Sequence, residues 1–188
     1  MFARLVLFRC PRAGWLCRGD PSVGCRTRRG AAVSVPAIRF ERDDLSRGVV
    51  VDLVDLHMRE AVENSPWGSV FALDPVGLRD PAITVWTAWE GDALLGMGAL
   101  KQLDATHGEL KSMRVAPAHL RRGIGAAVLA QLVSEGRAAG YQRLSLETGS
   151  NEAFAAARAM YARAGFVPCG PFAGYTDTAF SRYFTLDL

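Results

Sequence analysis

The strongest structural signal in this chain is the stretch Glu109-Leu110-Lys111-Ser112-Met113-Arg114-Val115-Ala116-Pro117, with Arg122-Gly123-Ile124-Gly125 following after four residues. Residues 109–115 have the composition of a β-strand, which ends at Ala116-Pro117 because proline cannot donate to a strand ladder. The two glycines then open a long helical pattern that ends at Ala139-Gly140. This order predicts an anion site, because unpaired N–H groups and the positive end of the helix dipole meet at a helix start. The apolar face of the predicted helix consists of Ile124, Val128, Leu129, Leu132 and Val133.

Segments on the C-terminal side continue the alternation of strands and helices. Residues 143–147 alternate as a strand, and an alanine-rich helix follows over 153–164. A short strand begins at Phe166, and a final strand spans 180–186.

Segments on the N-terminal side predict a hairpin and two helices. Residues 83–89 and 94–100 are β-rich runs joined by the turn Glu90-Gly91-Asp92. Before them, residues 36–40 predict a first strand, and a second short helix is expected over 70–78. The first helix is expected to be capped by Asp43 or Asp44, to bury Val49, Leu53 and Leu56, and to break at 65–68.

The elements together predict an α/β fold class, an α+β mixed sheet flanked by helices. Their expected order is β-α-α-β-β-β-α-β-α-β-β.

Length and composition exclude several classes of protein. The chain has 188 residues, which suits one domain, and its 49% hydrophobic and 22% charged residues exclude a disordered or collagen-like chain. No apolar run approaches the roughly 18 to 20 residues of a membrane span. Four cysteines are too few for a disulfide framework in a chain of this size. We therefore expect a globular cytoplasmic protein with no membrane partner.

Charge divides the chain into two parts. Residues 1–34 hold seven arginines and one acidic residue, whereas residues 35–188 hold fifteen basic and eighteen acidic residues. The mildly acidic body gives no reason to expect a nucleic-acid partner. We predict a basic N-terminal extension over 1–34 and a single domain over 35–188.

The extension lacks helical or strand periodicity, and more than one interpretation stays open. Its many arginines and few acidic residues are typical of a transit-type leader, although serines are scarce. A disordered tail, or sequence translated from upstream of the true start, is the favoured interpretation. A zinc site from Cys10, Cys17 and Cys25 is disfavoured, because the segment has no CxxC pair and no nearby histidine.

The glycine pair alone does not identify the anion. No lysine follows Gly125, as a Walker loop requires, and Val128 stands where a dinucleotide fingerprint has its third glycine. A purely structural role for Gly123 and Gly125 is equally compatible with this pattern.

The wider context is more specific than the glycines. The 109–117 strand, followed at fixed distance by residues 122–125, resembles the central motif of the GCN5-related N-acetyltransferase (GNAT) family. The order of elements looks like the acyl-CoA N-acyltransferase fold of that family, and the resemblance covers about residues 38–188. Four further residues match the AxxxYxxxGF ending of the family: Ala157, Tyr161, Gly165 and Phe166.

Three other segments resemble a bacterial subgroup of small acetyltransferases, the YsnE type. They are residues 107–114, 144–150 and 169–172.

Two positions depart from the family pattern. Leu120 stands where the loop motif usually has Gln or Arg, and Phe154 replaces the usual Asn seven residues before the tyrosine. Because backbone N–H groups do most of the pyrophosphate binding, we expect Leu120 to reduce the affinity for the cofactor without abolishing it.

The resemblance implies an acyltransferase that moves acetyl from acetyl-CoA, its co-substrate, directly to the amine of a small-molecule or amino-acid-like acceptor. In this family the strand at Met113, Arg114 and Val115 pairs through its backbone with the pantetheine arm. A backbone N–H near Val115 would meet the developing oxyanion. No metal is implied. The pyrophosphate is expected at the helix start and its basic rim, which comprise Arg121, Arg122, Gly123, Ile124, Gly125 and Ala126.

Two residues are the main catalytic candidates. Tyr161 aligns with the tyrosine that protonates the CoA thiolate, and a phenol is an acid of suitable strength; a buried structural tyrosine is the alternative. Glu109 begins the central strand, where several family members carry a base; a solvated or ion-paired carboxylate is its alternative. His107 and Glu147 are further candidates for the base.

The alternation of a strand should place Glu109, Lys111, Met113 and Val115 on one face, from which Glu109 could reach the cleft.

The acceptor pocket is the least defined part of the site. Aromatic residues in short strands belong to the core more often than to a ligand site. The candidates are His57, Trp67, Trp86, Trp89 and Tyr175.

Two other functions stay open. A catalytically weak acyl-CoA-binding or regulatory module would fit the departures at Leu120 and Phe154. The extension as a nucleic-acid arm would show strongly salt-dependent binding. The acceptor, the acyl-chain length and the assembly are not given by the sequence, and a homodimer is among the assemblies left open.

Overall fold

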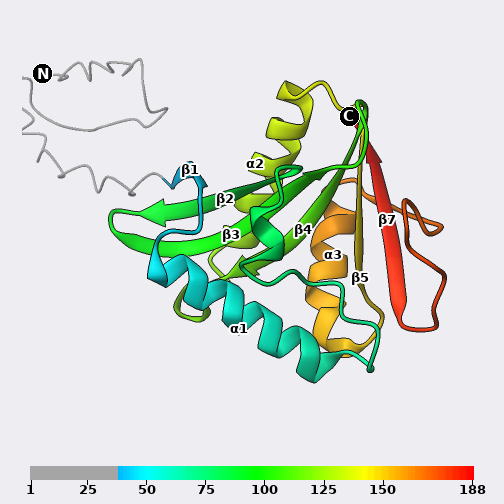
Figure 1. The fold of residues 1–188 in the computed structure, drawn as a ribbon, viewed down its shortest axis with the longest axis horizontal. Coiled ribbons are helices and arrows are strands. Elements are labelled where there is room, and N and C mark those ends of the chain that lie inside the picture. Colours follow the sequence, from blue (N-terminus) through cyan, green and yellow to red (C-terminus); the bar gives the residue numbers. More distant parts are fainter. Residues whose placement is uncertain (1–37) are drawn as a thin grey trace, which may run out of the picture. The chain divides into compact units, whose positions relative to one another are not determined.

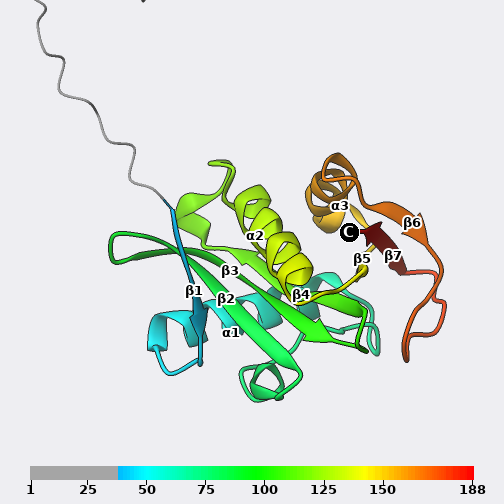
Figure 2. The ribbon, with the colours of Figure 1, turned by 90° about the horizontal axis from the view of Figure 1, so that it is seen from above.

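A seven-stranded mixed sheet with helices on both faces forms residues 38–188, the part of the chain that the computed structural model describes (Figures 1 and 2). The predicted extension over 1–34 lies outside the described residues. The strands are β1 (Arg39–Asp43), β2 (Ile83–Glu90), β3 (Ala93–Gln102), β4 (His107–Val115), β5 (Arg143–Gly149), β6 (Val167–Cys169) and β7 (Ser181–Asp187). The α-helices are α1 (Gly48–Asn64), α2 (Ile124–Ala138) and α3 (Ala155–Arg163), and 3₁₀ turns cover Gly77–Arg79, Pro117–His119 and Glu152–Phe154.

The sheet has the strand order β1-β2-β3-β4-β5-β7-β6. Its one parallel pair is β4 with β5, and the other neighbouring strands are antiparallel. The mixed sheet flanked by helices confirms the expected fold class, and the β2–β3 pair confirms the hairpin predicted from Glu90-Gly91-Asp92.

Each face of the sheet buries its own apolar cluster. Helix α1 lies on one face, and α2 and α3 lie on the other (Figure 2). The inward side of α2 is Ile124, Val128, Leu129 and Leu132, as the periodicity predicts, with Val133 partly buried beside them. The inward side of α1 is Val50, Leu53 and Val54, whereas Val49, expected inside, is exposed.

The N-terminal end of the domain differs from the expectation in its boundaries. Strand β1 runs over Arg39–Asp43 and not over 36–40. Asp43 and Asp44 accept hydrogen bonds from the backbone N–H groups of Leu45 and Ser46, at 2.7 and 2.9 Å. They therefore fix the turn before the helix, which begins at Gly48 without a side-chain cap.

The second helix predicted over 70–78 is wrong. The chain is irregular there until the 3₁₀ turn at Gly77–Arg79. Pro75 accounts for the difference, because proline has no N–H to donate and disfavours a helical backbone at the preceding Asp74. The carboxylate of Asp74 instead accepts the N–H of Gly77 at 2.7 Å.

A bulge in β4 changes which side chains share a face. The pairing with β3 shifts between Met97 and Ala99, and Ser112 within this irregularity has φ of 50°. Beyond the bulge, Met113 and Val115 pack with Leu110 in the cluster under α2. The expectation that Glu109, Lys111, Met113 and Val115 share one face is therefore wrong, because the extra residue reverses the alternation.

Strands β4 and β5 are paired at one end only. Their register covers residues 107–109 of β4 and 143–145 of β5, after which the two strands diverge (Figure 1). The rest of each strand therefore lacks its neighbour on this side.

Candidate active site

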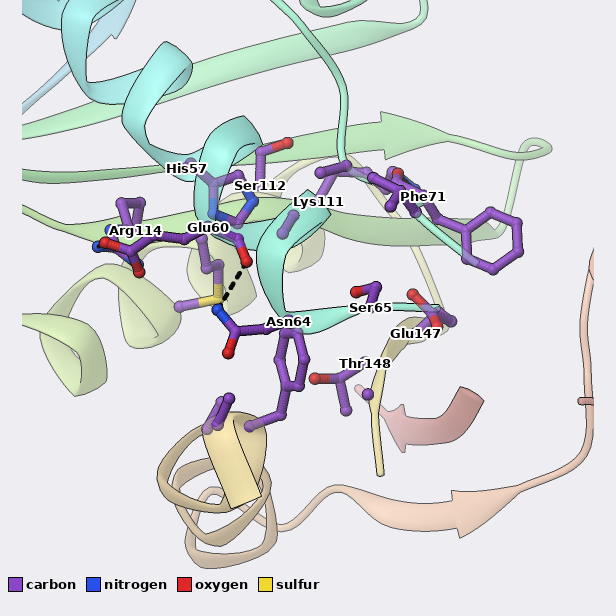
Figure 3. A pocket seen from close by; sticks show the side chains of 18 of the residues that line it. His57, Glu60, Asn64, Ser65, Phe71, Lys111, Ser112, Arg114, Glu147 and Thr148 are labelled. Atoms are coloured by element: carbon purple, nitrogen blue, oxygen red, sulfur yellow. Dashed lines mark hydrogen bonds and ion pairs between the residues drawn. The ribbon is translucent and has the colours of Figure 1, made fainter. Parts of the chain in front are cut away.

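A cavity of about 240 Å³ lies where β4 and β5 separate. Its walls come from the C-terminal half of α1, the connection from α1 to β2, the diverging strands and the start of α3 (Figure 3). The lining residues that bear on chemistry are His57, Glu60, Lys111, Arg114, Glu147 and Tyr161.

The end of β4 presents a backbone donor to this opening. The N–H of Ala116 donates to the carbonyl of Leu95 on β3 at 2.9 Å. Because successive N–H groups of a strand point to opposite sides, the N–H of Val115 points to the side from which β5 has diverged. This is the position at which the family resemblance implies the oxyanion donor.

The start of α2 provides further backbone donors. Gly123 precedes the helix with φ of 79°, a left-handed conformation that glycine adopts without strain. The first hydrogen bond of the helix runs from Ala127 N to Gly123 O at 3.1 Å. The N–H groups of Ile124, Gly125 and Ala126 therefore have no intrahelical acceptor and can bind an anion.

Gly125 holds this helix start close to β4. A Cβ atom on Gly125 would lie 3.1 Å from Met160 Sδ and 3.5 Å from Val115 Cγ2. The absence of a side chain therefore lets the helix start and the end of β4 form one continuous surface.

The two arginines before the helix have different surroundings. Arg122 donates to both carboxylate oxygens of Glu90 at 3.1 Å and also contacts His119. Arg121 is exposed and forms no ion pair among the described residues. Arg121 therefore has the freer positive charge at the rim of the helix start.

Tyr161 lies in the cavity wall as a buried phenol. Its hydroxyl donates to Met113 Sδ at 3.8 Å, which joins two residues that the sequence assigns to the site. Burial, and then the nearby Glu147, raise the pKa of Tyr161 to about 12. The phenol is therefore protonated at neutral pH and able to donate its proton.

Glu109 is held in a buried polar network and is not part of the cavity lining. Its carboxylate accepts a hydrogen bond from the hydroxyl of Tyr175 and lies 3.3 Å from Lys111 Nζ. The ammonium of Lys111 also donates to the carbonyl of Phe71 at 2.9 Å and to the Tyr175 hydroxyl at 2.8 Å. The network thus ties the connection after α1 to the segment before β7.

Glu147, the alternative base, projects from β5 into the cavity (Figure 3). It forms no ion pair with any residue in 38–188, and burial raises its pKa. The other alternative, His107, is buried outside the cavity lining, where its Nε2 lies 2.8 Å from Ser145 Oγ.

One end of the cavity holds residues that the sequence did not single out together. Arg114 is paired with Glu60 of α1, and His57 lies on the same helix. Burial and the charge of Arg114 lower the pKa of His57 to about 4, so its ring is neutral at neutral pH. A sequence signal for this wall exists, because His57, Glu60, Ala61 and Asn64 recur at the i, i+3, i+4, i+7 spacing of one helix face.

The aromatic candidates for the acceptor pocket separate into different places. Trp89 is buried in the cluster under α1, and Trp86 packs against the opposite cluster. Trp67 is exposed, and Tyr175 belongs to the Glu109 network. Of the five candidates, only His57 lines the cavity.

Phe154, the departure from the family pattern, forms an apolar part of the wall. Its ring lies against Phe180 at a centroid distance of 5.9 Å. A Cβ atom on Gly149 of β5 would lie only 2.4 Å from the Phe154 ring, so this glycine makes room for the phenylalanine.

Two negative findings concern the described residues alone. Within 38–188 no group of three or more His, Cys, Asp or Glu side chains could hold a metal ion. No helix in the same range has the length and apolar character needed to cross a membrane.

Comparison with protein families gives one match over most of the domain. The profile of the Acetyltransferase (GNAT) family matches residues 50–166.

Two curated bacterial proteins are similar over nearly their full lengths. "Uncharacterized N-acetyltransferase YsnE" of Bacillus subtilis is 48% identical over 146 residues, which are 78% of this chain and 97% of that protein. "Uncharacterized N-acetyltransferase YedL" of Escherichia coli is 44% identical over 149 residues, 79% and 94% of the two chains. The resemblance to the YsnE type is thereby confirmed.

Solved structures show the same fold at lower identity. A Bacillus subtilis acetyltransferase in complex with CoA superposes with a TM-score of 0.61 at 17% identity, covering 81% of this chain and 99% of that one.

Proposed function

The chain belongs to the GNAT acetyltransferase family, and on this basis we propose that it transfers acetyl from acetyl-CoA directly to the amine of a small-molecule or amino-acid-like acceptor. The observation that carries the proposal is the cavity between β4 and β5, with a protonated phenol and an unpaired carboxylate in its walls.

The binding of acetyl-CoA is assigned to backbone groups. The edge of β4 at Met113, Arg114 and Val115 has no neighbouring strand within residues 38–188. The pantetheine arm binds there through backbone hydrogen bonds, as an added β-strand would. The free N–H groups at the start of α2 bind the pyrophosphate, and Arg121 adds positive charge at its rim. The Val115 N–H polarises the thioester carbonyl, and one preorganised donor of this kind contributes about 3 kcal/mol to transition-state stabilisation.

The proton transfers are assigned to Glu147 and Tyr161. The amine attacks the carbonyl carbon, the C–N bond forms, and the carboxylate of Glu147 takes the proton that the nitrogen loses. When the C–S bond breaks, Tyr161 gives its proton to the departing thiolate. A carboxylate whose pKa is raised by burial is a stronger base than an exposed one, which supports this choice.

Glu109 receives a different role from the one expected. It lies outside the cavity lining with Lys111 and Tyr175 around it, so we assign to it the positioning of these two side chains. Glu147 is preferred as the base because it faces the cavity.

Replacing Tyr161 by Phe tests the proposal against the alternative of a weak acyl-CoA-binding module, which Leu120 and Phe154 motivate. An enzyme of the proposed kind should lose about 100-fold in kcat. It should keep the rise in Tm that acetyl-CoA gives the wild type, since the phenol ring is retained. Thiol release and thermal melts of the full chain measure both effects. A wild type with no turnover would favour the binding module, whereas a variant as active as an active wild type would remove Tyr161 from the role of acid.

The cytoplasmic location stays a prediction from composition.

A further inference from the structure

Two charged groups in the cavity wall can still bind a ligand: Arg114, which pairs with Glu60 through one nitrogen alone, and Glu147, which forms no ion pair among residues 38–188. The other buried cation of the wall, Lys111, has three donors and three protein acceptors, on Phe71, Tyr175 and Glu109. Arg114 and Glu147 remain, so a complementary ligand carries a negative group for Arg114 and a positive group for Glu147.

Arg114 has spare donors for an anion. Only Nη2 of its guanidinium has a hydrogen-bond acceptor among residues 38–188, the carboxylate of Glu60. Its Nε is buried without an acceptor in that range. The neighbouring His57 is neutral at neutral pH, so Arg114 is the one cationic side chain at this end of the cavity among residues 38–188. A planar guanidinium with free N–H groups is suited to a carboxylate.

Glu147 lies at the other end of the cavity. Figure 3 shows Arg114, Glu60 and His57 together at one end, and Glu147 near Ser65 at the opposite end. Glu147 forms no ion pair in the described part of the chain, so it is free to face an ammonium group.

We propose that the acceptor is an amino acid whose carboxylate binds Arg114 while an amine at its other end faces Glu147. The inference rests on the proposed function and specifies its acceptor. Glu60 is then the competitor that the substrate carboxylate partly displaces from Arg114.

The test uses the full chain, acetyl-CoA and a panel of the twenty amino acids, each paired with its carboxamide, with thiol release as the readout. The amide replaces the carboxylate by a neutral group of similar size, and because its amine has a lower pKa, each kcat/KM is calculated on the concentration of unprotonated amine. We expect at least one acid to be acetylated about 10-fold or more better than its amide, as kcat/KM. Arg114→Gln should raise KM for that acid by about 10- to 100-fold and change KM for the amide little. Arg114→Lys should restore part of the loss.

Glu60→Gln should change KM in the opposite direction to Arg114→Gln. A substitution that merely disrupted the site would not lower KM. Glu60→Gln should lower KM for the acid a few-fold, because the competing carboxylate is removed. Arg137→Gln, an exposed arginine on α2, is the matched control and should leave every value unchanged.

The outcomes separate the two proposals. Equal turnover of acids and amides by the wild type would overturn the inference and leave the proposed function standing. A raised KM for the acid in Glu60→Gln would also overturn the inference. No thiol release with any amine, from a chain that binds acetyl-CoA, would overturn both.

Discussion

Glu109 and Glu147 lie on neighbouring strands of the same sheet, yet their carboxylates have opposite surroundings. Glu109 is 2% exposed and bonded to Tyr175 and Lys111, whereas Glu147 faces the cavity without an ion pair in residues 38–188. Their difference lies in what each side chain contacts, which neither residue type nor spacing reveals.

Glu147→Gln should reduce kcat by about 100-fold, because an amide cannot accept the proton of the amine. The pH profile of the wild type gives an independent check. The active form is the ionised carboxylate, so activity is lost as pH falls through the Glu147 pKa. Because burial raises that pKa, the acid limb that Glu147 adds should lie at higher pH than for an exposed glutamate. The variant should lack this limb and keep only the one set by the acceptor amine, since a protonated amine cannot attack.

Glu109→Gln is the matched substitution and should act on stability first. It breaks a buried ion pair, which costs about 3 kcal/mol, and it should leave the acid limb of the pH profile where it is in the wild type. Urea unfolding and pH–rate profiles of both variants decide the matter. A folded Glu109→Gln without activity beside an active Glu147→Gln would assign the base to Glu109.

At the scale of elements, the bulge in β4 determines the geometry of the site. Ser112 adopts φ of 50°, and its hydroxyl is buried without a hydrogen-bond partner in the described residues. The bulge turns Met113 towards Tyr161 and leaves Arg114 on the α1 side.

Ser112→Gly should raise the free energy of unfolding by about 1 kcal/mol, because glycine adopts a positive φ without the steric cost of a Cβ atom. Ser134→Gly in α2 is the control with the opposite sign, and should cost about 0.5 kcal/mol through its helix propensity. Thermal or urea unfolding measures both. A destabilised Ser112→Gly would show that the serine side chain itself holds the bulge.

Most elements could be predicted from the sequence because their signals are local. The helix at 124–138 has an unbroken apolar face, and the hairpin has a turn of suitable residues. The bulge could not be predicted, because an extra residue in one strand depends on its pairing with β3 and leaves the composition of 109–115 unchanged. The helix expected over 70–78 is absent for a local reason that the sequence does contain, because Pro75 lies inside that range.

The candidate site was predictable where backbone geometry forms it. Gly123 and Gly125 at the start of α2 lie where the motif implies, and so does Tyr161. The cavity wall of Arg114, Glu60 and His57, by contrast, joins two elements far apart in the sequence. Such a wall depends on how the elements pack. The spacing of His57, Glu60, Ala61 and Asn64 on one face of α1 is the part of it that the sequence indicates.

At the scale of the whole molecule, His57 makes stability depend on pH. Its pKa is about 4 in the folded chain against 6.5 for the free side chain, so between these values the unfolded chain binds a proton that the folded chain does not. The free energy of unfolding should therefore fall as pH drops from 6.5 to 4, by about 3 kcal/mol in total.

The comparison of wild type with His57→Gln isolates this contribution. Urea unfolding at pH 7 and pH 5 should show a smaller decrease in the variant, since Gln does not titrate. Parallel decreases in the two proteins would place the pH dependence in other groups.

The central claim, acetyl transfer from acetyl-CoA to an amine, is tested most directly by following thiol release from acetyl-CoA by the full chain. The amino acids and their amides serve as acceptors, and the acetylated product is identified by mass spectrometry. We predict thiol release that depends on the amine, with one acetylated amine formed for each thiol. A chain whose Tm rises with acetyl-CoA, yet releases no thiol with any of these amines, would contradict the claim.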